Sequence, residues 1–401
     1  MFRRTRKHRQ YLRNKKQSRI TQLIRKGPYW VKDRIARQRL QMKRLERSQN
    51  ALKKQRQETR QLRLQVRNLN RRLRYSTLMR AEQRNWFFLV GEMKSGTSWL
   101  MNMLHSHPEI FCKGEGSFFG REVSIEEMGI YKASAPSLYN ALSTCEGLQT
   151  WRSLSWNSWS QEQAEDDDVR NLTRLAIDYY LAKGSARSGK WIVGDKSPLH
   201  VDHVDEIFDL YPEAKVIHIV RDGRDVAVSL MFHFWNLARD NKDRGGFYDL
   251  EPEEVAKRDA YFEDPNNFLA SGNSIFIEER LRQIAVRWSR RASKASREGP
   301  KLFGSGFFQL RYEDLLERPE ENLKVMFGFL DAQTDDDIIR RCAEENSFER
   351  KTGRPRGHEE SRKFMRKGVA GDWRRVFTDH DRQVYEEIAG DTLVEMGYSL
   401  D

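Results

Sequence analysis

Residues 91–99 read GEMKSGTSW, directly follow the apolar run WFFLV, and constrain the fold more than any other stretch. Two glycines five apart, with a hydroxyl two places after the second, match most of the phosphate-binding pattern G-x-x-x-x-G-K-[ST]. Thr97 stands where that pattern has its lysine, and Lys94 supplies a lysine three residues earlier. Between a strand and a helix, such a turn aims the amides of residues 95–98 at an anion. The stretch predicts a phosphate site, and a tight structural turn is the alternative.

Short apolar runs recur after residue 85, at 86–91, 191–195, 215–220 and 307–315. Helix-compatible stretches separate them, which is the pattern of strands buried on both faces of a parallel sheet and wrapped by helices. We therefore expect one α/β domain over residues 85–401. Segments 239–272 and 347–372 are expected to be loops over one edge of this domain, because both are rich in charge and glycine.

The charge of the chain is concentrated at its N-terminus. Residues 1–84 carry 29 Lys and Arg against 4 Asp and Glu, a net +25, so the remainder carries −12 of the overall +13. Residues 1–30 contain the breaker pair Gly27-Pro28 and are expected to be a disordered basic tail. Residues 31–84 lack Gly and Pro and are rich in Arg, Lys, Gln and Leu, which predicts a helix.

Apolar residues in this basic helix recur at a spacing of seven. Leu45, Leu52, Val66 and Leu73 share one series, and Leu62 and Leu69 occupy companion positions. The pattern indicates a short coiled coil that would make the protein a homo-oligomer, although the many arginines would repel a parallel partner. A solvated basic helix is the alternative. In either case we expect residues 1–84 to bind a polyanion such as nucleic acid, acidic glycan or an anionic membrane surface.

The cysteines and the lengths of the apolar runs indicate the cellular compartment in which the protein is expected. Three cysteines, Cys112, Cys145 and Cys342, are odd in number and lack metal-ligand spacing, so neither a disulfide framework nor a zinc site is expected. The sequence contains no apolar run near 18 residues, and no apolar segment follows the basic start. These features predict a cytoplasmic protein without a transmembrane helix or signal peptide.

Two further stretches indicate anion binding. In KVIHIVRDGRDVAVSL, Arg221 ends a strand and Ser229 follows eight residues later, about two helical turns on, so both can reach one phosphate. In KFMRKGVAGDW, Arg366, Lys367 and Gly368 offer two cations and a flexible backbone, which suits a clamp on an exposed phosphate.

Together these motifs resemble those of the PAPS-dependent sulfotransferases, PAPS being 3′-phosphoadenosine 5′-phosphosulfate. The resemblance spans nearly all of residues 85–401 and implies PAPS as the cofactor. It implies that Lys94, Ser95, Gly96, Thr97 and Ser98 hold the 5′-phosphosulfate and that Arg221 and Ser229 hold the 3′-phosphate. Arg366, Lys367 and Gly368 match the family's third cofactor-binding motif, a loop that clamps the nucleotide. Trp99 and Tyr312 are expected to enclose the adenosine, with ordinary core aromatics as the alternative.

The resemblance also implies catalytic roles. Sulfuryl transfer needs no metal when Lys94 stabilises the departing oxygen, and Lys196 of the DKSP segment would be a second cation. Lys196 could instead pair with Asp195. In a metal-dependent P-loop kinase, which is the alternative function, Asp195 would hold the metal. A non-catalytic polyanion-binding protein is the third hypothesis.

The acceptor needs a base. Pro198 occupies the place where many cytosolic family members have a histidine, whereas Glu115 in IFCKGEGSFFG resembles the glutamate of the glycan- and tyrosine-modifying members. An apolar, partly dry site would raise the pKa of Glu115 toward that of a useful base, and His200 is the rival. The acceptor is expected to be a carbohydrate hydroxyl or amine, with a phenol or peptide tyrosine as alternatives. Aromatic residues in 151–160 and 232–246 could form a sugar platform or pack in the core.

Overall fold

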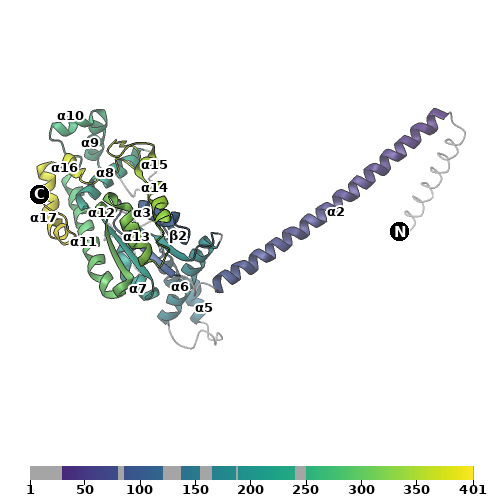
Figure 1. Ribbon diagram of the computed structural model, residues 1–401, viewed down its shortest axis with the longest axis horizontal. Coiled ribbons are helices and arrows are strands. Elements are labelled where there is room, and N and C mark those ends of the chain that lie inside the picture. The colour runs from purple at the N-terminus through teal and green to yellow at the C-terminus, as the bar shows by residue number, and fades with distance from the viewer. Residues whose placement is uncertain are drawn as a thin grey trace. The chain divides into compact units, whose positions relative to one another are not determined.

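The computed structural model describes residues 29–79, 85–120, 137–153, 165–186, 188–239 and 250–400. The chain divides into two units, Met1–Tyr75 and Ser76–Asp401. Helix α2 (Tyr29–Met79) spans 51 residues and accounts for nearly all of the described part of the first unit (Figure 1). The helix begins two residues before the predicted start at 31, and it is continuous because a long stretch without Gly or Pro has no residue that interrupts helical hydrogen bonds. Residues 80–84 of the predicted helix and residues 1–28 of the predicted tail lie outside the described residues.

A five-stranded, entirely parallel sheet forms the centre of the second unit, in the order β2-β3-β1-β4-β5. Its strands are β1 (Asn85–Val90), β2 (Ile110–Gly114), β3 (Ile192–Lys196), β4 (Lys215–Val220) and β5 (Phe307–Arg311). This confirms the predicted α/β class. The strand expected over 307–315 is too long, because α12 (Tyr312–Glu317) begins at Tyr312 with Glu313 and Asp314 in its first turn, where carboxylates favour a helix.

Successive residues of β1 contribute to opposite faces of the sheet, as the two-residue repeat of a strand requires. Phe87 and Leu89 belong to the core on one face, with α3 (Thr97–Ser106), α13 (Pro319–Phe329) and α14 (Asp336–Glu345). Trp86, Phe88 and Val90 belong to the core on the other face, with α6 (Glu165–Ser185) and α7 (Val204–Leu210). Helices therefore cover both faces of the sheet (Figure 1).

A third core lies among α8 (Gly223–Arg239), α9 (Pro252–Glu263), α10 (Pro265–Ala270), α11 (Glu278–Phe303) and α17 (Asp379–Glu395). The expectation of an entirely irregular segment over 239–272 is wrong, because this segment contains α9 and α10. Glu251 and Glu254 form a capping box at the start of α9, and Asp264 caps α10. Segment 347–372 is largely irregular, as expected, and contains the short α15 (Phe348–Thr352).

The short elements complete the second unit. They are α4 (Leu138–Ser143), α5 (Glu146–Ser153), η3 (Pro198–His203), η4 (Gly304–Gly306) and α16 (Trp373–Val376). Among the described residues, no helix is both long enough and apolar enough to cross a membrane. Because all strands run parallel, the segments that follow β1, β2, β3 and β4 lie along one edge of the sheet. This edge carries the residues singled out in the sequence.

Candidate functional site

The turn from β1 to α3 contains two glycines, Gly91 and Gly96, at which any side chain would force neighbouring atoms to shift. A Cβ on Gly91, whose φ is +154°, would lie 2.4 Å from the carbonyl oxygen of Ile219. A Cβ on Gly96, whose φ is +91°, would lie 2.6 Å from the ring of Tyr312. The turn therefore passes close to β4 on one side and to Tyr312 on the other, and this explains both glycines of the motif.

The amides at the start of α3 are arranged to bind an anion. The first hydrogen bond of the helix runs from the Leu100 amide to the Gly96 carbonyl at 3.0 Å, so the amides of the preceding helical residues lack partners within the helix. The Ser95 amide instead donates to the Glu92 carbonyl at 3.1 Å, so the expectation that this amide faces the anion is wrong. The Ser95 hydroxyl is buried and has no hydrogen-bond partner among the described residues.

Arg221 connects β4 to this turn. Its Nη1 donates to the Lys94 carbonyl at 3.1 Å, and its guanidinium lies 4.6 Å from the centre of the Tyr312 ring. Its Nη2 donates to the Val369 carbonyl at 3.3 Å, which brings in the loop that follows Gly368. One arginine therefore joins three of the predicted binding segments.

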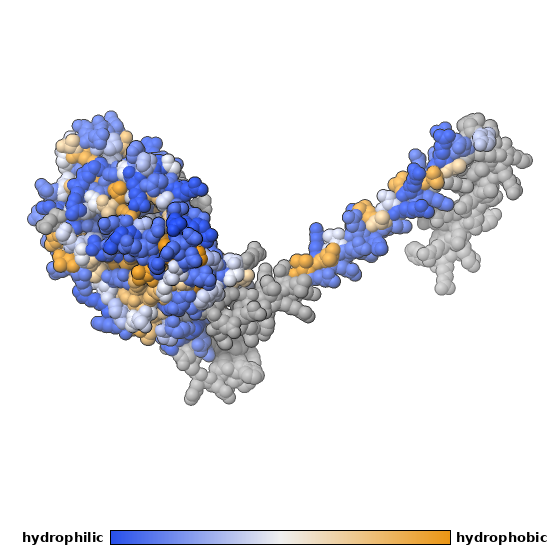
Figure 2. Space-filling view, viewed as in Figure 1, coloured by the Kyte–Doolittle hydropathy of each residue, from blue (hydrophilic) through white to orange (hydrophobic). Residues whose placement is uncertain are grey.

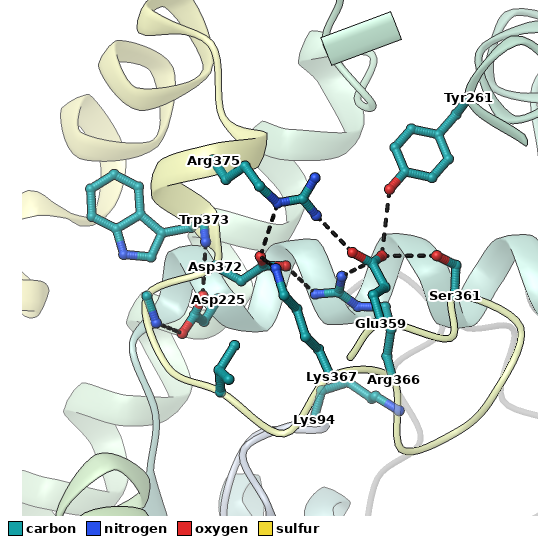
Figure 3. Close-up of polar contacts among 12 residues, drawn as sticks. Lys94, Asp225, Tyr261, Glu359, Ser361, Arg366, Lys367, Asp372, Trp373 and Arg375 are labelled. Carbon is teal, nitrogen blue, oxygen red and sulfur yellow. Dashed lines mark hydrogen bonds and ion pairs between the residues drawn. The ribbon is translucent and has the colours of Figure 1, made fainter. Parts of the chain in front are cut away.

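Arg366 and Lys367 are already paired with carboxylates of their own region (Figure 3). Nη2 of Arg366 and Nζ of Lys367 both donate to the carboxylate of Asp372, and Nη1 of Arg366 donates to Glu359 Oε1 at 2.7 Å. Although burial opposes it, the Arg366 charge and the bond from Lys367 hold the pKa of Asp372 well below its usual range. An anion that binds these two cations must therefore share them with Asp372.

A cavity of about 140 Å³ joins these segments. Its wall includes every predicted cofactor residue except Ser95, namely Lys94, Gly96, Thr97, Ser98, Trp99, Arg221, Ser229, Tyr312, Arg366, Lys367 and Gly368. The described wall contains five Lys or Arg side chains and no carboxylate. The cavity thus suits a ligand with several negative charges.

Trp99 and Tyr312 form one side of this cavity. Their rings meet edge to face with centroids 5.7 Å apart, and the Trp99 indole nitrogen donates to the Asn346 carbonyl at 2.8 Å. Both residues also contact the core on that face of the sheet. The two residues therefore pack against the core and also line the cavity, and their enclosure of a nucleotide stays a prediction.

Lys94 has an unusual environment for a lysine. Its φ is +67°, and its Nζ lies 4.0 Å from the centre of the Phe364 ring. Burial, followed by the nearby charges of Arg221 and Arg366, lowers the pKa of Lys94 to about 7. A bound anion would oppose these effects and favour the protonated ammonium.

Lys196 and Glu115 form a pair outside the described lining of this cavity. Lys196 ends β3 and Glu115 follows β2, two paired strands, and Lys196 Nζ lies 2.5 Å from Glu115 Oε1. The Glu115 side chain is 62% exposed, so the dry environment expected for it is wrong. The alternative partner of Lys196, Asp195, is buried and accepts from the Gly116 amide at 3.4 Å. Burial raises the pKa of Asp195 to about 7.

His200, the rival base, is buried beneath Phe118 and Phe119. Its Nε2 accepts a hydrogen bond from the Phe118 amide at 3.2 Å, which leaves that nitrogen unable to accept a further proton without breaking the bond. Burial lowers the pKa of His200 to about 3. The residue thus fits a structural histidine that holds the segment after Glu115.

The aromatic segments considered for the acceptor differ in their placement. Residues 154–160 and 240–246 lie outside the described residues. Phe234 and Trp235 are fully buried in the third core, so they are not available to stack against a sugar. Phe232 lines a second cavity.

A second cavity, of about 160 Å³, adjoins the first. It is lined by Lys94, Ser229, Phe232, His233, Asn236, Leu237, Arg362, Lys363, Phe364 and Arg366, and it shares Lys94, Ser229, Phe364 and Arg366 with the first cavity. His233 and Phe364 were not predicted. His233 lies one helical turn after Ser229, and Phe364 lies two residues before Arg366. Their closeness in sequence to the two motifs is the feature from which the sequence could have predicted them as cavity residues. Among the described residues, no group of three His, Cys, Asp or Glu forms a metal-ligand cluster.

Comparisons with known proteins find sulfotransferases. A model of the sulfotransferase family matches residues 87–270. Mouse sulfotransferase 1B1 is 28% identical over 197 residues, covering 45% of this chain and 56% of that protein. A flavonol sulfotransferase-like protein of Flaveria bidentis is 29% identical over 201 residues, covering 46% and 56%. The matched part therefore spans about half the length of these curated relatives.

Solved structures of sulfotransferases are also similar. A mouse sulfotransferase complexed with PAP aligns over 79% of this chain and 89% of its own, at 16% identity and a TM-score of 0.41. A sulfotransferase from Alicyclobacillus acidocaldarius aligns over 63% and 83%, at 22% identity and a TM-score of 0.35. Because both TM-scores are below 0.5, the α/β fold is assigned from the parallel sheet of this chain and not from these structures.

Proposed function

Because this chain belongs to the sulfotransferase family, we propose that it transfers a sulfuryl group from PAPS to a hydroxyl or amine of a carbohydrate. The observation that carries the proposal is the convergence of three distant segments on one cationic cavity. Residues from the turn after β1, the end of β4 with α8, and the loop before α16 all line it.

The residues present fit the charges of PAPS. The close approaches at Gly91 and Gly96 form a narrow turn, and the buried Ser95 hydroxyl and Arg221 Nε have no partners among the described residues. Lys94 and residues 95–98 would hold the 5′-phosphosulfate, while Arg221, Ser229 and residues 366–368 would hold the 3′-phosphate. When bound, PAPS supplies an activated sulfuryl group on a phosphosulfate anhydride.

Lys94 and Lys196 supply positive charge in this proposal. Lys94, protonated, balances the charge that develops on the departing phosphate oxygen. Lys196 is held at the tip of β3 with its side chain 4% exposed, and it fixes the Glu115 carboxylate through their ion pair. Glu115 accepts the proton of the acceptor, and its 62% exposure leaves it accessible to a large acceptor such as a glycan. Neither role requires a metal.

The functional test is transfer itself. The full chain is incubated with PAPS and a panel of glycans, phenols and tyrosine peptides, and each product is followed by mass. We expect sulfated glycan without added Mg²⁺. Sulfation of phenols alone would contradict the carbohydrate acceptor, and phosphorylation by ATP with Mg²⁺ would favour the kinase instead.

The basic unit is proposed to bring the enzyme to a polyanion. Along α2, exposed apolar residues alternate with charged ones, including Leu45, Leu52 and Val66 at 56%, 48% and 55% exposure (Figure 2). The net +25 of residues 1–84 favours an acidic glycan, a nucleic acid or an anionic membrane surface. The apolar series would equally support pairing with a second α2, and the molar mass of the chain in solution distinguishes a homo-oligomer from a monomer.

A further inference from the structure

The second cavity begins where the first ends. The two share Lys94, so a group that enters the second cavity reaches the same ammonium that the first presents to the proposed sulfuryl donor. If residues 95–98, Arg221 and residues 366–368 hold the nucleotide, the wall that belongs to the second cavity alone is left for another ligand. This wall is made by Phe232, His233, Asn236, Leu237, Arg362 and Lys363. An acceptor site in the second cavity therefore rests on the proposed function.

Two cations belong to the second cavity alone. Arg362 and Lys363 line it and do not line the first, and its described wall contains no carboxylate. Lys363 has only a distant carboxylate partner, Glu360 at 3.9 Å, while Arg362 lies 5.6 Å from the centre of the Phe262 ring. Within the described part of the chain, Arg362 forms no ion pair. Positive charge that the protein leaves unbalanced in a cavity favours an anionic ligand.

The segment that carries these cations is fixed to α8. Nδ2 of Asn236 donates to the Ser361 carbonyl at 2.8 Å, so Arg362 and Lys363 follow an anchored residue. This bond also assigns the orientation of the amide. The other amide atom, Oδ1, is buried and has no hydrogen-bond partner among the described residues. The two cations of the second cavity are therefore held on a segment that α8 positions.

The remaining wall is apolar or neutral. Phe232, Leu237 and Phe364 supply apolar surface, and the ring of Phe364 is 68% exposed. Burial, followed by the charge of Lys94, lowers the pKa of His233 to about 4, so its imidazole is neutral at pH 7. The wall therefore combines an apolar surface for a sugar ring with two cations for an acid group.

We propose that the second cavity is the acceptor site and that it selects a sugar bearing an anionic group, which Arg362 and Lys363 contact. The acceptor would then be an acidic carbohydrate, and its negative charge would also favour approach to the net positive residues 1–84.

The test uses two small sugars that differ in charge, methyl β-D-glucuronide and methyl β-D-glucoside. Each is titrated into the full chain, with and without saturating PAP, while the imidazole NMR signal of His233 reports binding inside the cavity rather than on α2. This signal is assigned with His233→Asn. We expect the glucuronide to bind about tenfold more tightly than the glucoside, as one charge-assisted contact allows. Added salt should reduce this difference.

The double variant Arg362→Gln/Lys363→Gln should weaken glucuronide binding about tenfold and leave glucoside binding within about twofold. Its affinity for PAP should stay at the wild-type value. The matched control, Arg318→Gln/Lys324→Gln, removes two exposed cations outside both cavities and should change neither sugar.

Three results would overturn the proposal. These are equal binding of the two sugars by the wild type, unchanged glucuronide binding by the double variant, and weaker PAP binding by that variant, which would assign both cations to the nucleotide. A wild-type chain that selects the glucuronide but does not bind PAP would instead contradict the proposed function, so the two failures are distinguishable.

Discussion

Lys196 Nζ and Glu115 Oε1 lie 2.5 Å apart at the carboxyl edge of the sheet, and the two side chains differ sharply in exposure. The lysine is 4% exposed and the glutamate is 62% exposed. A nearly buried cation on one strand therefore holds a carboxylate that is exposed to solvent. This pair joins β3 to the segment after β2. Neither residue belongs to the described wall of the two cavities that Lys94 lines.

Replacing Glu115 with Gln should separate chemistry from binding. The amide keeps the length of the side chain but cannot accept the acceptor's proton, so sulfate transfer should fall about 10²–10⁴-fold. The affinity for PAP, measured by calorimetry, should stay near the wild-type value. Glu213→Gln, which removes an exposed carboxylate paired with Arg174, is the matched control. Full transfer activity in Glu115→Gln would remove Glu115 from the proposed mechanism.

Binding of PAP should take up a proton near neutral pH. The pKa of Lys94 is lowered to about 7 by burial and by Arg221 and Arg366, and an anion beside the ammonium should raise it again. At pH 8 the free lysine is mostly neutral, so binding should take up close to one proton, and this uptake should vanish below about pH 6. Affinity should therefore weaken as the pH rises from 6 to 8.

Calorimetry in buffers of different ionisation enthalpy measures this uptake. Lys94→Met should abolish it and should also cut transfer at least about a hundredfold. An uptake that persists in Lys94→Met would assign the proton to another group.

Arg221→Gln should reduce affinity for nucleotides that carry a 3′-phosphate. Loss of a charged donor should weaken PAP binding by about 2–4 kcal/mol. Binding of adenosine 5′-phosphate, which lacks the 3′-phosphate, should change much less in the same titration. If the wild type binds the two nucleotides equally, Arg221 does not recognise a 3′-phosphate.

Gly96→Ala should destabilise the protein and close the cavity. The new Cβ would meet the Tyr312 ring at 2.6 Å, in a backbone conformation with φ +91°. Gly353→Ala is the matched control, because its φ is +71° and nothing lies within 4 Å of its Cβ. The control should lose about 1 kcal/mol of unfolding free energy in urea, and Gly96→Ala should lose more. Equal losses of unfolding free energy in the two variants would show that the Tyr312 ring moves away from the new Cβ at little energetic cost.

Much of the fold could be predicted because buried parallel strands are apolar along their whole length. β1 follows this rule after its first residue and β4 follows it except at Lys215 and His218, whereas β3 is buried throughout but ends in the charged pair Asp195 and Lys196. The sequence analysis did not predict β2, whose apolar run is only Ile110 to Cys112 and whose last two residues, Lys113 and Gly114, are exposed. The end of β5 was misplaced because Tyr312 is apolar in sequence but begins a helix, and its ring is needed against Gly96.

The sequence predicted which residues line the candidate site, but it did not predict which of their charges are paired with neighbouring carboxylates. The cavity brings Lys94, Arg221 and Arg366 together, as the motifs indicated. The pairing of Arg366 with Asp372 and the anchoring of His200 by the Phe118 amide depend on tertiary contacts, for which a linear pattern has no signal. The exposure of Glu115 likewise follows from where the chain turns after β2.

Calorimetric titration of PAP into the full chain, in the presence of EDTA, determines whether this chain binds a sulfotransferase nucleotide without a metal. We expect saturable binding of one PAP per chain without any divalent metal, with ATP bound far more weakly under the same conditions. Absence of PAP binding, together with tight binding of ATP once Mg²⁺ is restored, would show that the cavity belongs to a kinase instead.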